Sequence, residues 1–244
     1  PHSSGIASSA SAFSALSLCL TDIEKSILCS SDFLKKSSFI SRLGSGSASR
    51  SLYGPVAIWG QHKNIPSASD QYAIAYHDLH ENFKNYQDTI LLIDKGTKKV
   101  SSTVGHELMH NHPFSKQRFL QASSNLESII NVLKSGDLDE FISISESEAL
   151  TLHAMMMTSN PYFILMKQGT LSAIEKIWSF RSESKVPLSF TLDAGANVHL
   201  LYPLAYKQQV LDFIDNELIV FCQNQHYISD EVGSGANIIS ASYA

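Results

Sequence analysis

The sequence predicts an α+β protein of two domains. Short apolar runs bounded by glycine or proline indicate strands, and longer segments with apolar residues at helical spacing indicate helices. Both kinds of segment occur in mixed order along the 244 residues, which favours an α+β architecture. A chain of this length can bury one large core or two modest ones.

The first part of the chain is expected to contain one helix and two short strands. Residues 8–20 alternate Ala, Ser, Phe and Leu at helical spacing without a breaker, and they follow a turn that contains glycine. Residues 52–59 and 71–76 are short apolar runs that suit strands.

The boundary between the two domains is expected at the clearest strand of the sequence. This strand is DTILLID at residues 88–94, and Lys95-Gly96 ends it. We place the boundary just before Asp88, because the strand leads into the helical half of the chain. The predicted domains are therefore residues 1–87 and 88–244.

The second domain is expected to be mainly helical from residue 115 onward. A helix at 115–136 is indicated by apolar side chains on one face, namely Phe119, Leu120, Leu126, Ile129, Ile130 and Leu133. Gly136 is well placed to end this helix. The remaining predicted elements are helices at 138–157, 170–180 and 207–219 and strands at 187–193 and 198–202.

Composition and charge exclude several classes of function. Hydrophobic residues make up 43% of the chain and charged residues 17%, and no apolar run approaches the length of a membrane-spanning helix. The net charge is −5 and there is no basic tract, so neither nucleic acid nor a membrane surface is an expected partner. Cys19, Cys29 and Cys222 are odd in number and widely spaced, which indicates free thiols in a reducing compartment.

Three short motifs combine small residues with groups that, in the first two, can bind anions and, in the third, can act as a base or orienting carboxylate. PHSSGIASSA at residues 1–10 places glycine and serines before a helix, where backbone N–H groups and the helix N-terminus attract phosphate. GSGSASRSLYG at residues 44–54 exposes hydroxyls beside Arg50, a planar fork suited to carboxylate or phosphate. TLDAGAN at residues 191–197 places an Asp at the end of an apolar strand. Taken singly, these motifs also suit close packing, a polar loop and a turn.

Together and in this order, the motifs resemble those of a known family. Residues 5–10 resemble the phosphate-binding loop of the superfamily that contains galactokinase, homoserine kinase and mevalonate kinase. Residues 45–54 are similar to a signature of its decarboxylase branch, the diphosphomevalonate decarboxylases, and so are VSSTVG at 100–105 and TLDAG at 191–195. MMTSNP at residues 156–161 extends the resemblance over nearly the whole chain.

The resemblance implies both a fold and a reaction. The fold is a two-domain small-metabolite kinase fold, with an incomplete ribosomal-S5-like N-terminal domain, a ferredoxin-like C-terminal domain and the active site in the cleft between them. The reaction is ATP-dependent decarboxylation of mevalonate 5-diphosphate to isopentenyl diphosphate, a step of isoprenoid synthesis, with ATP and Mg²⁺ as cofactors. The resemblance further implies a cytoplasmic enzyme and, as an additional expectation, a homodimer.

The resemblance also implies a role for each matching residue. ATP phosphates are expected to contact Gly5, Ala7, Ser8 and Ser9. The acidic substrate is expected in a loop formed by Ser45, Gly46, Ser47, Ala48, Ser49 and Arg50, with Arg50 at the carboxylate that leaves as CO2. Ser102 and Thr103 are expected at the substrate diphosphate. Asp193 is expected beside the tertiary hydroxyl, which it orients or deprotonates for phosphoryl transfer.

The sequence departs from the family pattern in two residues and at its start. The family usually has Pro where Ala196 stands, and Cys is common where Ser49 stands, but neither change removes a group on which the reaction depends. The family's N-terminal part carries a Lys near the substrate and strands that complete the nucleotide site. We expect that part to be missing from this chain and the chain alone to be inactive.

A second enzyme class is suggested by HELMH at residues 106–110. Two histidines four residues apart on a helix can bind zinc while the glutamate between them activates water, as in metalloproteases. Pro113 and Lys116 occupy the positions of the Gly and third His of the extended motif, and Pro113 disfavours a long helix here. We therefore expect no metal site. The sequence is also compatible with a related mevalonate-phosphate kinase or decarboxylase, and with a remnant that has no activity.

Overall fold

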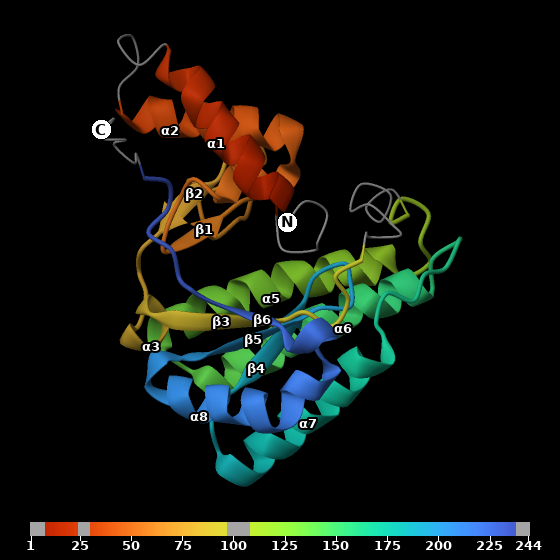
Figure 1. Ribbon diagram of the computed structural model, residues 1–244. Coiled ribbons are helices and arrows are strands. Elements are labelled where there is room, and N and C mark those ends of the chain that lie inside the picture. Colours follow the sequence, from red (N-terminus) through yellow and green to blue (C-terminus); the bar gives the residue numbers. More distant parts are fainter. Residues whose placement is uncertain (1–7, 24–29, 97–107, 238–244) are drawn as a thin grey trace. The chain divides into compact units, whose positions relative to one another are not determined.

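The computed structural model describes residues 8–23, 30–96 and 108–237 and separates them into two compact units. Unit 1 comprises residues 8–77 and 232–237, and unit 2 comprises residues 78–231. Figure 1 shows the elements of each unit. The domain boundary just before Asp88 stays a prediction.

Unit 1 contains a pair of helices, a short turn of 3-10 helix and a two-stranded sheet. The helices are α1 (Ser8–Asp22) and α2 (Ser30–Gly44), and η1 (Gly46–Arg50) follows α2 directly. Strands β1 (Val56–Ile58) and β2 (Ile74–Tyr76) pair antiparallel. The prediction of α1 is confirmed, while the two predicted strands shrink to three residues each. The sequence analysis missed α2, because its buried residues are serines and give no apolar period.

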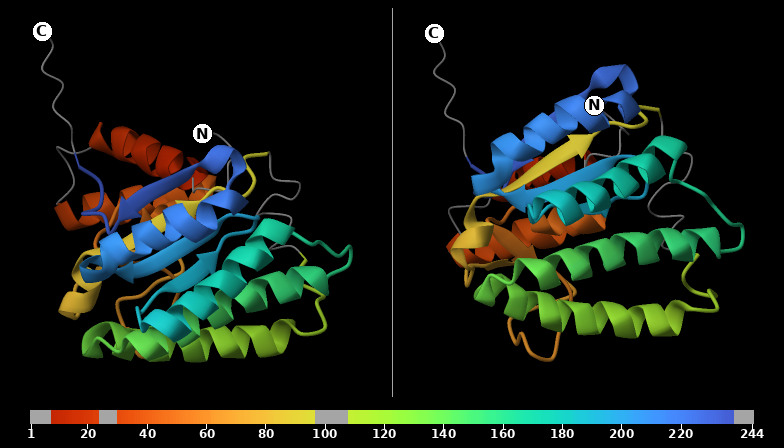
Figure 2. Two further views of the ribbon diagram at one scale, coloured as in Figure 1. Left: turned by 60° about the horizontal axis from the view of Figure 1, so that its bottom comes forward. Right: turned by 90° about the horizontal axis from the view of Figure 1, so that it is seen from below.

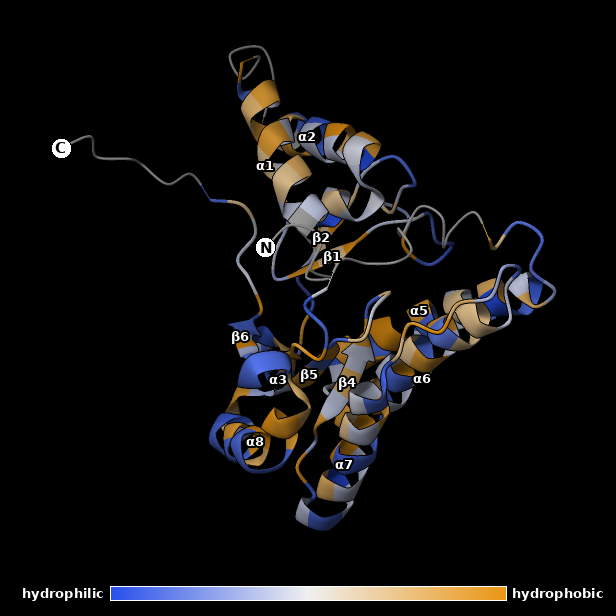
Figure 3. Ribbon diagram, turned by 45° about the vertical axis from the view of Figure 1, so that its right-hand side comes forward, coloured by the Kyte–Doolittle hydropathy of each residue, from blue (hydrophilic) through white to orange (hydrophobic). Residues whose placement is uncertain are grey.

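Small side chains allow α1 and α2 to approach each other closely. Their buried positions include Ala10, Ser14, Ser17 and Thr21 on α1 and Ser37, Ser38 and Ser41 on α2. Most of the buried hydroxyls donate to a carbonyl one turn earlier in the same helix, as Ser17 does to Ser14, so no polar cost accompanies this packing. The Phe13 ring packs directly on Gly44, since a Cβ there would lie 2.2 Å from the ring. Figure 3 shows the hydrophobic character of α1.

Unit 2 is organised around a four-stranded antiparallel sheet with the strand order β4-β5-β3-β6. Its strands are β3 (Tyr86–Leu91), β4 (Ser189–Leu192), β5 (Val198–Pro203) and β6 (Tyr227–Glu231). Thr191 pairs with His199, which in turn pairs with Ile90. Strand β3 begins two residues before the predicted strand and ends three residues earlier. Strand β6 was missed, because it is a polar edge strand with its last three residues exposed.

The helices of unit 2 cover one face and one edge of this sheet. In chain order they are α3 (Glu81–Lys84), α5 (Ser115–Ser135), α6 (Leu138–Met157), α7 (Gln168–Ser184) and α8 (Lys207–Phe213). Figures 1 and 2 show α7 and α8 side by side on one face, while α6 runs along β4 and α5 packs on α6. Ile177 of α7 and Val210 of α8 belong to the buried cluster that includes Phe190, Leu200 and Tyr202.

The remaining elements of unit 2 are short helical turns. Short helical turns complete the chain at η2 (Leu204–Tyr206), η3 (Ile214–Leu218), η4 (Ile219–Phe221) and η5 (Gln223–Gln225). The predicted helix at 207–219 is therefore regular only to Phe213 and then widens into a π-turn. The end of α5 at Gly136 is confirmed, since Gly136 adopts a left-handed φ of 82°.

One predicted buried face is partly wrong. Leu133 of α5 is buried as expected, but Phe119 and Leu120 are 61% and 58% exposed. The early turns of α5 face α6 through polar side chains instead, since Arg118 and Asn125 bind Glu148 and Gln121 lies within hydrogen-bond distance of Thr151.

Among the helices of the described residues, none combines the length and apolar character needed to cross a lipid bilayer.

Cys19 and Cys222 are free thiols, as predicted, and Cys29 lies outside the described residues. Burial raises the pKa of Cys222 to about 11, so this thiol stays protonated and inert.

Candidate active site

The predicted site residues that the structure describes fall into two groups, one in each unit. Unit 1 holds Ser9 and the turn from Ser45 to Arg50, and unit 2 holds Asp193. Gly5, Ala7, Ser102 and Thr103 lie outside the described residues, as does the side chain of Ser8.

The η1 turn of unit 1 is held in place by buried serine hydroxyls. Ser38 of α2 is fully buried, donates to the Ser49 carbonyl at 2.8 Å and accepts from the Ala73 N–H at 2.9 Å. The Ser49 hydroxyl donates to the Gly46 carbonyl at 2.9 Å. A Cβ at Gly46 would lie 3.0 Å from the Trp59 ring, so the indole closes the other side of the turn. This network fixes the backbone from which Ser45, Ser47 and Arg50 project.

Three serine hydroxyls meet at the N-terminal end of α1. The Ser45 Oγ lies 3.5 Å from the Ser9 Oγ and 3.5 Å from the Ser47 Oγ. Hydroxyl pairs usually bond at about 2.7–2.8 Å, so these contacts are loose and the hydroxyls can turn toward an anion. The helix N-terminus adds partial positive charge at the same place. The structure thus brings a residue predicted for ATP next to two predicted for the acidic substrate.

Arg50 ends the η1 turn with an exposed side chain. Within the described part of the chain, no hydrogen bond or ion pair engages its guanidinium. Arg42 of the same unit differs, because its Nε and Nη2 donate to the carbonyl and the side chain of Gln71 at 3.1 and 3.3 Å. A guanidinium without such partners can offer a bidentate fork to a carboxylate.

Asp193 follows β4 in a loop that buried groups of other elements hold. Thr170 of α7 is fully buried and donates to the Ala196 carbonyl at 2.7 Å. The Asn197 side chain accepts from the Asp94 N–H at 3.1 Å. Asp193 itself is exposed, and its Oδ1 accepts from the Ala194 N–H at 2.8 Å. The loop therefore presents a carboxylate from a fixed backbone at the carboxyl end of a buried strand.

His153 of α6 contacts this loop through a backbone atom. Its side chain is 2% exposed, and its Nε2 lies 3.2 Å from the Asp193 carbonyl oxygen. Because a carbonyl can only accept, Nε2 must carry the proton. Desolvation by burial lowers the pKa of His153 below its ordinary 6.5, although the bond to Asp193 and the negative charge of its side chain oppose this. The imidazole is therefore neutral at physiological pH.

This pKa shift predicts a pH dependence of stability. Below pH 6.5 the unfolded chain binds a proton at His153 that the folded protein does not. The contribution of His153 to the free energy of unfolding is therefore complete above pH 6.5 and decreases as the pH falls below that value. We expect the free energy of unfolding of the wild type to drop, relative to that of His153→Gln, as the pH falls from about 7.5 to about 5. Urea unfolding at several pH values measures this difference, and parallel curves for the two proteins would contradict it.

The structure describes only the last three residues of the HELMH segment. His106 and Glu107 of the HELMH segment lie outside the described residues, and His110 is exposed. His112 is buried instead, and its Nε2 donates to the Met155 carbonyl at 3.0 Å. No group of three or more His, Cys, Asp or Glu side chains in the described ranges could hold a metal ion.

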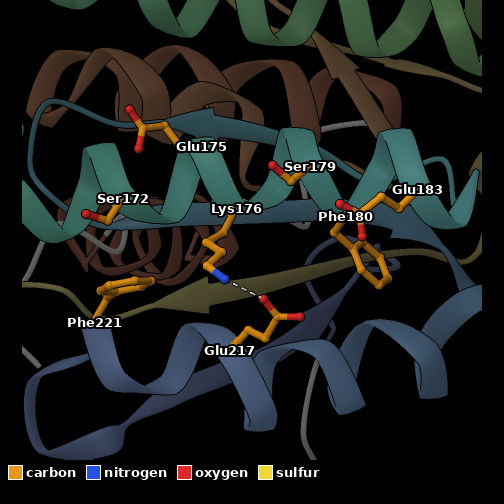
Figure 4. A pocket seen from close by; sticks show the side chains of 8 residues that line it. All are labelled: Ser172, Glu175, Lys176, Ser179, Phe180, Glu183, Glu217 and Phe221. Carbon is orange, nitrogen blue, oxygen red and sulfur yellow. Dashed lines mark hydrogen bonds and ion pairs between the residues drawn. The ribbon is translucent and has the colours of Figure 1, made fainter.

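A pocket of about 550 Å³ lies elsewhere in unit 2, between α7 and the turns that follow α8 (Figure 4). Its lining residues are Ser172, Glu175, Lys176, Ser179, Phe180, Glu183, Glu217 and Phe221. Lys176 is bound to Glu217 at 2.8 Å across it. The pocket contains none of the predicted site residues and is open and largely acidic, so we assign it no part in phosphate binding.

The sequence analysis missed the groups that support the site. Ser38, Thr170 and His153 were not singled out as parts of the site. A histidine at helical spacing from Ile142, Glu146 and Ala149 on the same predicted helix was the available signal. Its partner could not be inferred, because 40 residues separate the two in sequence.

Comparison with known proteins places the chain in a family. Residues 1–73 match the diphosphomevalonate decarboxylase-like N-terminal domain, and residues 89–240 match the mevalonate 5-diphosphate decarboxylase C-terminal domain. A diphosphomevalonate decarboxylase of Ganoderma lucidum is 27% identical over 221 residues, which are 88% of this chain and 54% of that protein. A phosphomevalonate decarboxylase of Haloferax volcanii is 23% identical, over 82% of this chain and 58% of that protein. The chain spans about half the length of the curated relatives it matches.

Solved structures agree with this assignment. The mevalonate diphosphate decarboxylase of Staphylococcus aureus superimposes with a TM-score of 0.82 at 29% identity, over 98% of this chain and 69% of that one. A structure described as MDDEF in complex with MVAPP, AMPPCP and magnesium has a TM-score of 0.81 at 26% identity, over 96% and 68% of the two chains.

The fold and the matches together define the class of this protein. It is a two-domain α+β protein of the small-metabolite kinase type, as the sequence predicted. The four-stranded antiparallel sheet of unit 2 is the core of its ferredoxin-like domain. The chain belongs to the mevalonate 5-diphosphate decarboxylase family.

Proposed function

We propose that the whole protein catalyses ATP-dependent decarboxylation of mevalonate 5-diphosphate to isopentenyl diphosphate. The observation that carries this proposal is the match of both halves of the chain, in order, to the two domains of one decarboxylase family. The chemistry of the described residues is consistent with it, because hydroxyls, a helix N-terminus, an arginine and a carboxylate suit an anionic substrate and phosphoryl transfer.

In the proposed reaction, Asp193 lies beside the tertiary hydroxyl of the substrate. The hydroxyl loses its proton to the carboxylate while its oxygen attacks the γ-phosphorus of ATP, and ADP leaves. The new phosphate is a good leaving group. When its C–O bond breaks, positive charge develops on the carbon, and the bond to the carboxylate breaks to give CO2 and the alkene.

Arg50 is proposed to bind the substrate carboxylate. Its fork would orient the carboxylate through two parallel N–H···O bonds. Ser45 and Ser47 would bind the same substrate through their hydroxyls, and the loose contacts that these hydroxyls make are consistent with reorientation on binding. Ser102 and Thr103 are proposed to contact the diphosphate of the substrate.

The nucleotide is proposed to bind at the N-terminal end of α1, through Gly5, Ala7, Ser8 and Ser9. A related structure is described as containing AMPPCP, a nucleotide analogue, together with magnesium, which supports ATP and Mg²⁺ for this chain. The residues present fit such an ion, since the Ser9 hydroxyl lies at the anion-binding end of the helix and Mg²⁺ prefers oxygen ligands. When bound with the phosphates, Mg²⁺ neutralises charge that would otherwise oppose transfer.

A second candidate is decarboxylation of mevalonate 5-phosphate, which the match to the Haloferax volcanii phosphomevalonate decarboxylase favours. The diphosphate reaction ranks first because the Ganoderma lucidum enzyme is more similar. The two substrates, offered separately to the full-length protein with ATP and Mg²⁺, decide between them. We expect kcat/KM to be higher for the diphosphate. A higher value for the monophosphate would reverse the assignment.

The proposal also makes a prediction about metal content. A zinc protease would need His106 and His110 as ligands, so removal of zinc would abolish its activity. We expect the purified full-length protein to contain no stoichiometric zinc by elemental analysis. We also expect decarboxylation to persist after a zinc-selective chelator is added in the presence of excess Mg²⁺. One zinc per chain, with loss of activity on chelation, would contradict this account.

Two features of the protein in its cell are proposed from the family resemblance. One is a cytoplasmic location, which the free thiols of Cys19 and Cys222 support. The other is a homodimer, which light scattering of the full-length protein tests directly.

A further inference from the structure

We propose that His153 is a positioning residue for Asp193. In this account its Nε2–H holds the Asp193 backbone carbonyl and thereby sets the direction in which the carboxylate faces the substrate hydroxyl. The inference rests on the proposed function for its catalytic consequence, but the ordering of the loop can be observed without any substrate.

The position of His153 on α6 brings its side chain to the loop that contains Asp193. It lies one helical turn after Ala149, whose small side chain belongs to the buried core of unit 2. Helix α6 packs along β4, so a side chain one turn further on reaches the loop that follows β4. An imidazole here is 2% exposed and makes its hydrogen bond to a backbone atom of Asp193.

The contact acts on backbone geometry next to the carboxylate. The Asp193 carbonyl accepts from His153 at 3.2 Å and also from the Gly195 N–H at 2.7 Å. The Ala194 N–H donates to the Asp193 Oδ1 at 2.8 Å. The backbone on both sides of the Asp193 peptide and one carboxylate oxygen are therefore linked, so rotation of this peptide would move the carboxylate.

Burial of an aliphatic side chain at position 153 would cost less free energy than burial of a histidine. Burial of the imidazole costs free energy that only a hydrogen bond offsets. Thr170 holds the opposite end of the same loop through the Ala196 carbonyl at 2.7 Å. Two buried donors from two different helices thus hold the loop at both ends, which is the arrangement that preorganisation of a reacting group requires.

The chain offers a matched control for this contact. His112 is also buried, at 5% exposure, and its Nε2 also donates to a backbone carbonyl, that of Met155 at 3.0 Å. His112→Leu therefore removes a comparable imidazole–carbonyl bond from the same unit, together with the contacts of this imidazole to Thr158 Oγ1 and the Phe114 N–H, without touching the Asp193 loop. Any effect of His153→Leu that His112→Leu lacks is specific to the loop.

The kinetic arm of the experiment uses a double-mutant cycle in the full-length protein. We expect His153→Leu to lower kcat about ten- to hundredfold with little change in KM for ATP, because small misplacements of a reacting group are that costly. His153→Gln, which retains a donor, should recover most of the loss, and His112→Leu should change kcat less than about twofold. In the Asp193→Asn background, His153→Leu should lower kcat less than about twofold further. An equal loss in both backgrounds would show that His153 acts only on stability and would overturn the proposal.

The second arm measures hydrogen exchange of the Ala194 and Gly195 amides, without substrate. We expect exchange to be at least about tenfold faster in His153→Leu than in the wild type or His112→Leu. Equal exchange in the three proteins would overturn the positioning role. If the wild type does not decarboxylate mevalonate 5-diphosphate, the proposed function fails, and this arm alone decides whether His153 orders the loop.

Discussion

Asp193→Asn is expected to lower kcat of the full-length protein by about two orders of magnitude or more, which corresponds to about 2.7 kcal/mol of lost transition-state stabilisation. The amide has nearly the same shape as the carboxylate, and it can still accept the Ala194 N–H through its oxygen. It cannot take the proton of the substrate hydroxyl, however. We therefore expect KM for the substrate to remain within a fewfold of the wild-type value. Steady-state kinetics with mevalonate 5-diphosphate as the varied substrate measure both constants.

Asp137→Asn is the matched control for this prediction. Asp137 is the N-cap of α6, where its Oδ1 accepts from the Glu140 N–H at 3.0 Å. Asparagine caps helices about as well as aspartate, so this variant removes a carboxylate without a structural loss. It should keep wild-type kinetics. If Asp193→Asn retains near-wild-type turnover as well, Asp193 has no part in the mechanism.

Arg50→Lys is expected to lower kcat/KM by about tenfold or more. Lysine keeps the positive charge but loses the planar fork that binds a carboxylate through two parallel hydrogen bonds. Because the proposed site orients the carboxylate for loss as CO2, the change should affect binding, turnover or both. Kinetics with the diphosphate substrate measure the effect.

Arg42→Lys provides the comparison for the Arg50 variant. Arg42 is in the same unit but is bound to Gln71, at the surface. It should tolerate lysine with less than about a twofold change in kcat/KM. Indistinguishable kinetics of Arg50→Lys and the wild type would remove Arg50 from the carboxylate site.

The fold could be predicted from sequence where elements are long and periodic. The helices α5 and α6 have the predicted bounds to within a residue, because their apolar residues repeat and Gly136 separates them. The helix α2 was missed because its buried residues are serines, whose hydroxyls are satisfied by backbone carbonyls and leave no apolar period. Edge strand β6 was missed for the related reason that few of its side chains are buried.

The site could be predicted as a set of motifs but not as a geometry. The order of motifs pointed to the correct family, and the residues Ser9, Ser45 and Ser47 do meet in unit 1. What the sequence could not supply was the support, since Ser38, His153 and Thr170 act through backbone carbonyls distant in sequence. Such contacts depend on how helices pack, which no local pattern encodes.

The most direct test of the central claim is the stoichiometry of the reaction of the full-length protein. Mevalonate 5-diphosphate labelled at the carboxyl carbon is incubated with ATP and Mg²⁺, and ADP and labelled CO2 are measured in the same vessel. The account predicts that one CO2 is released for each ADP formed, and that neither appears without ATP. ADP formation without CO2 would identify a kinase of the same family and contradict the proposed decarboxylation.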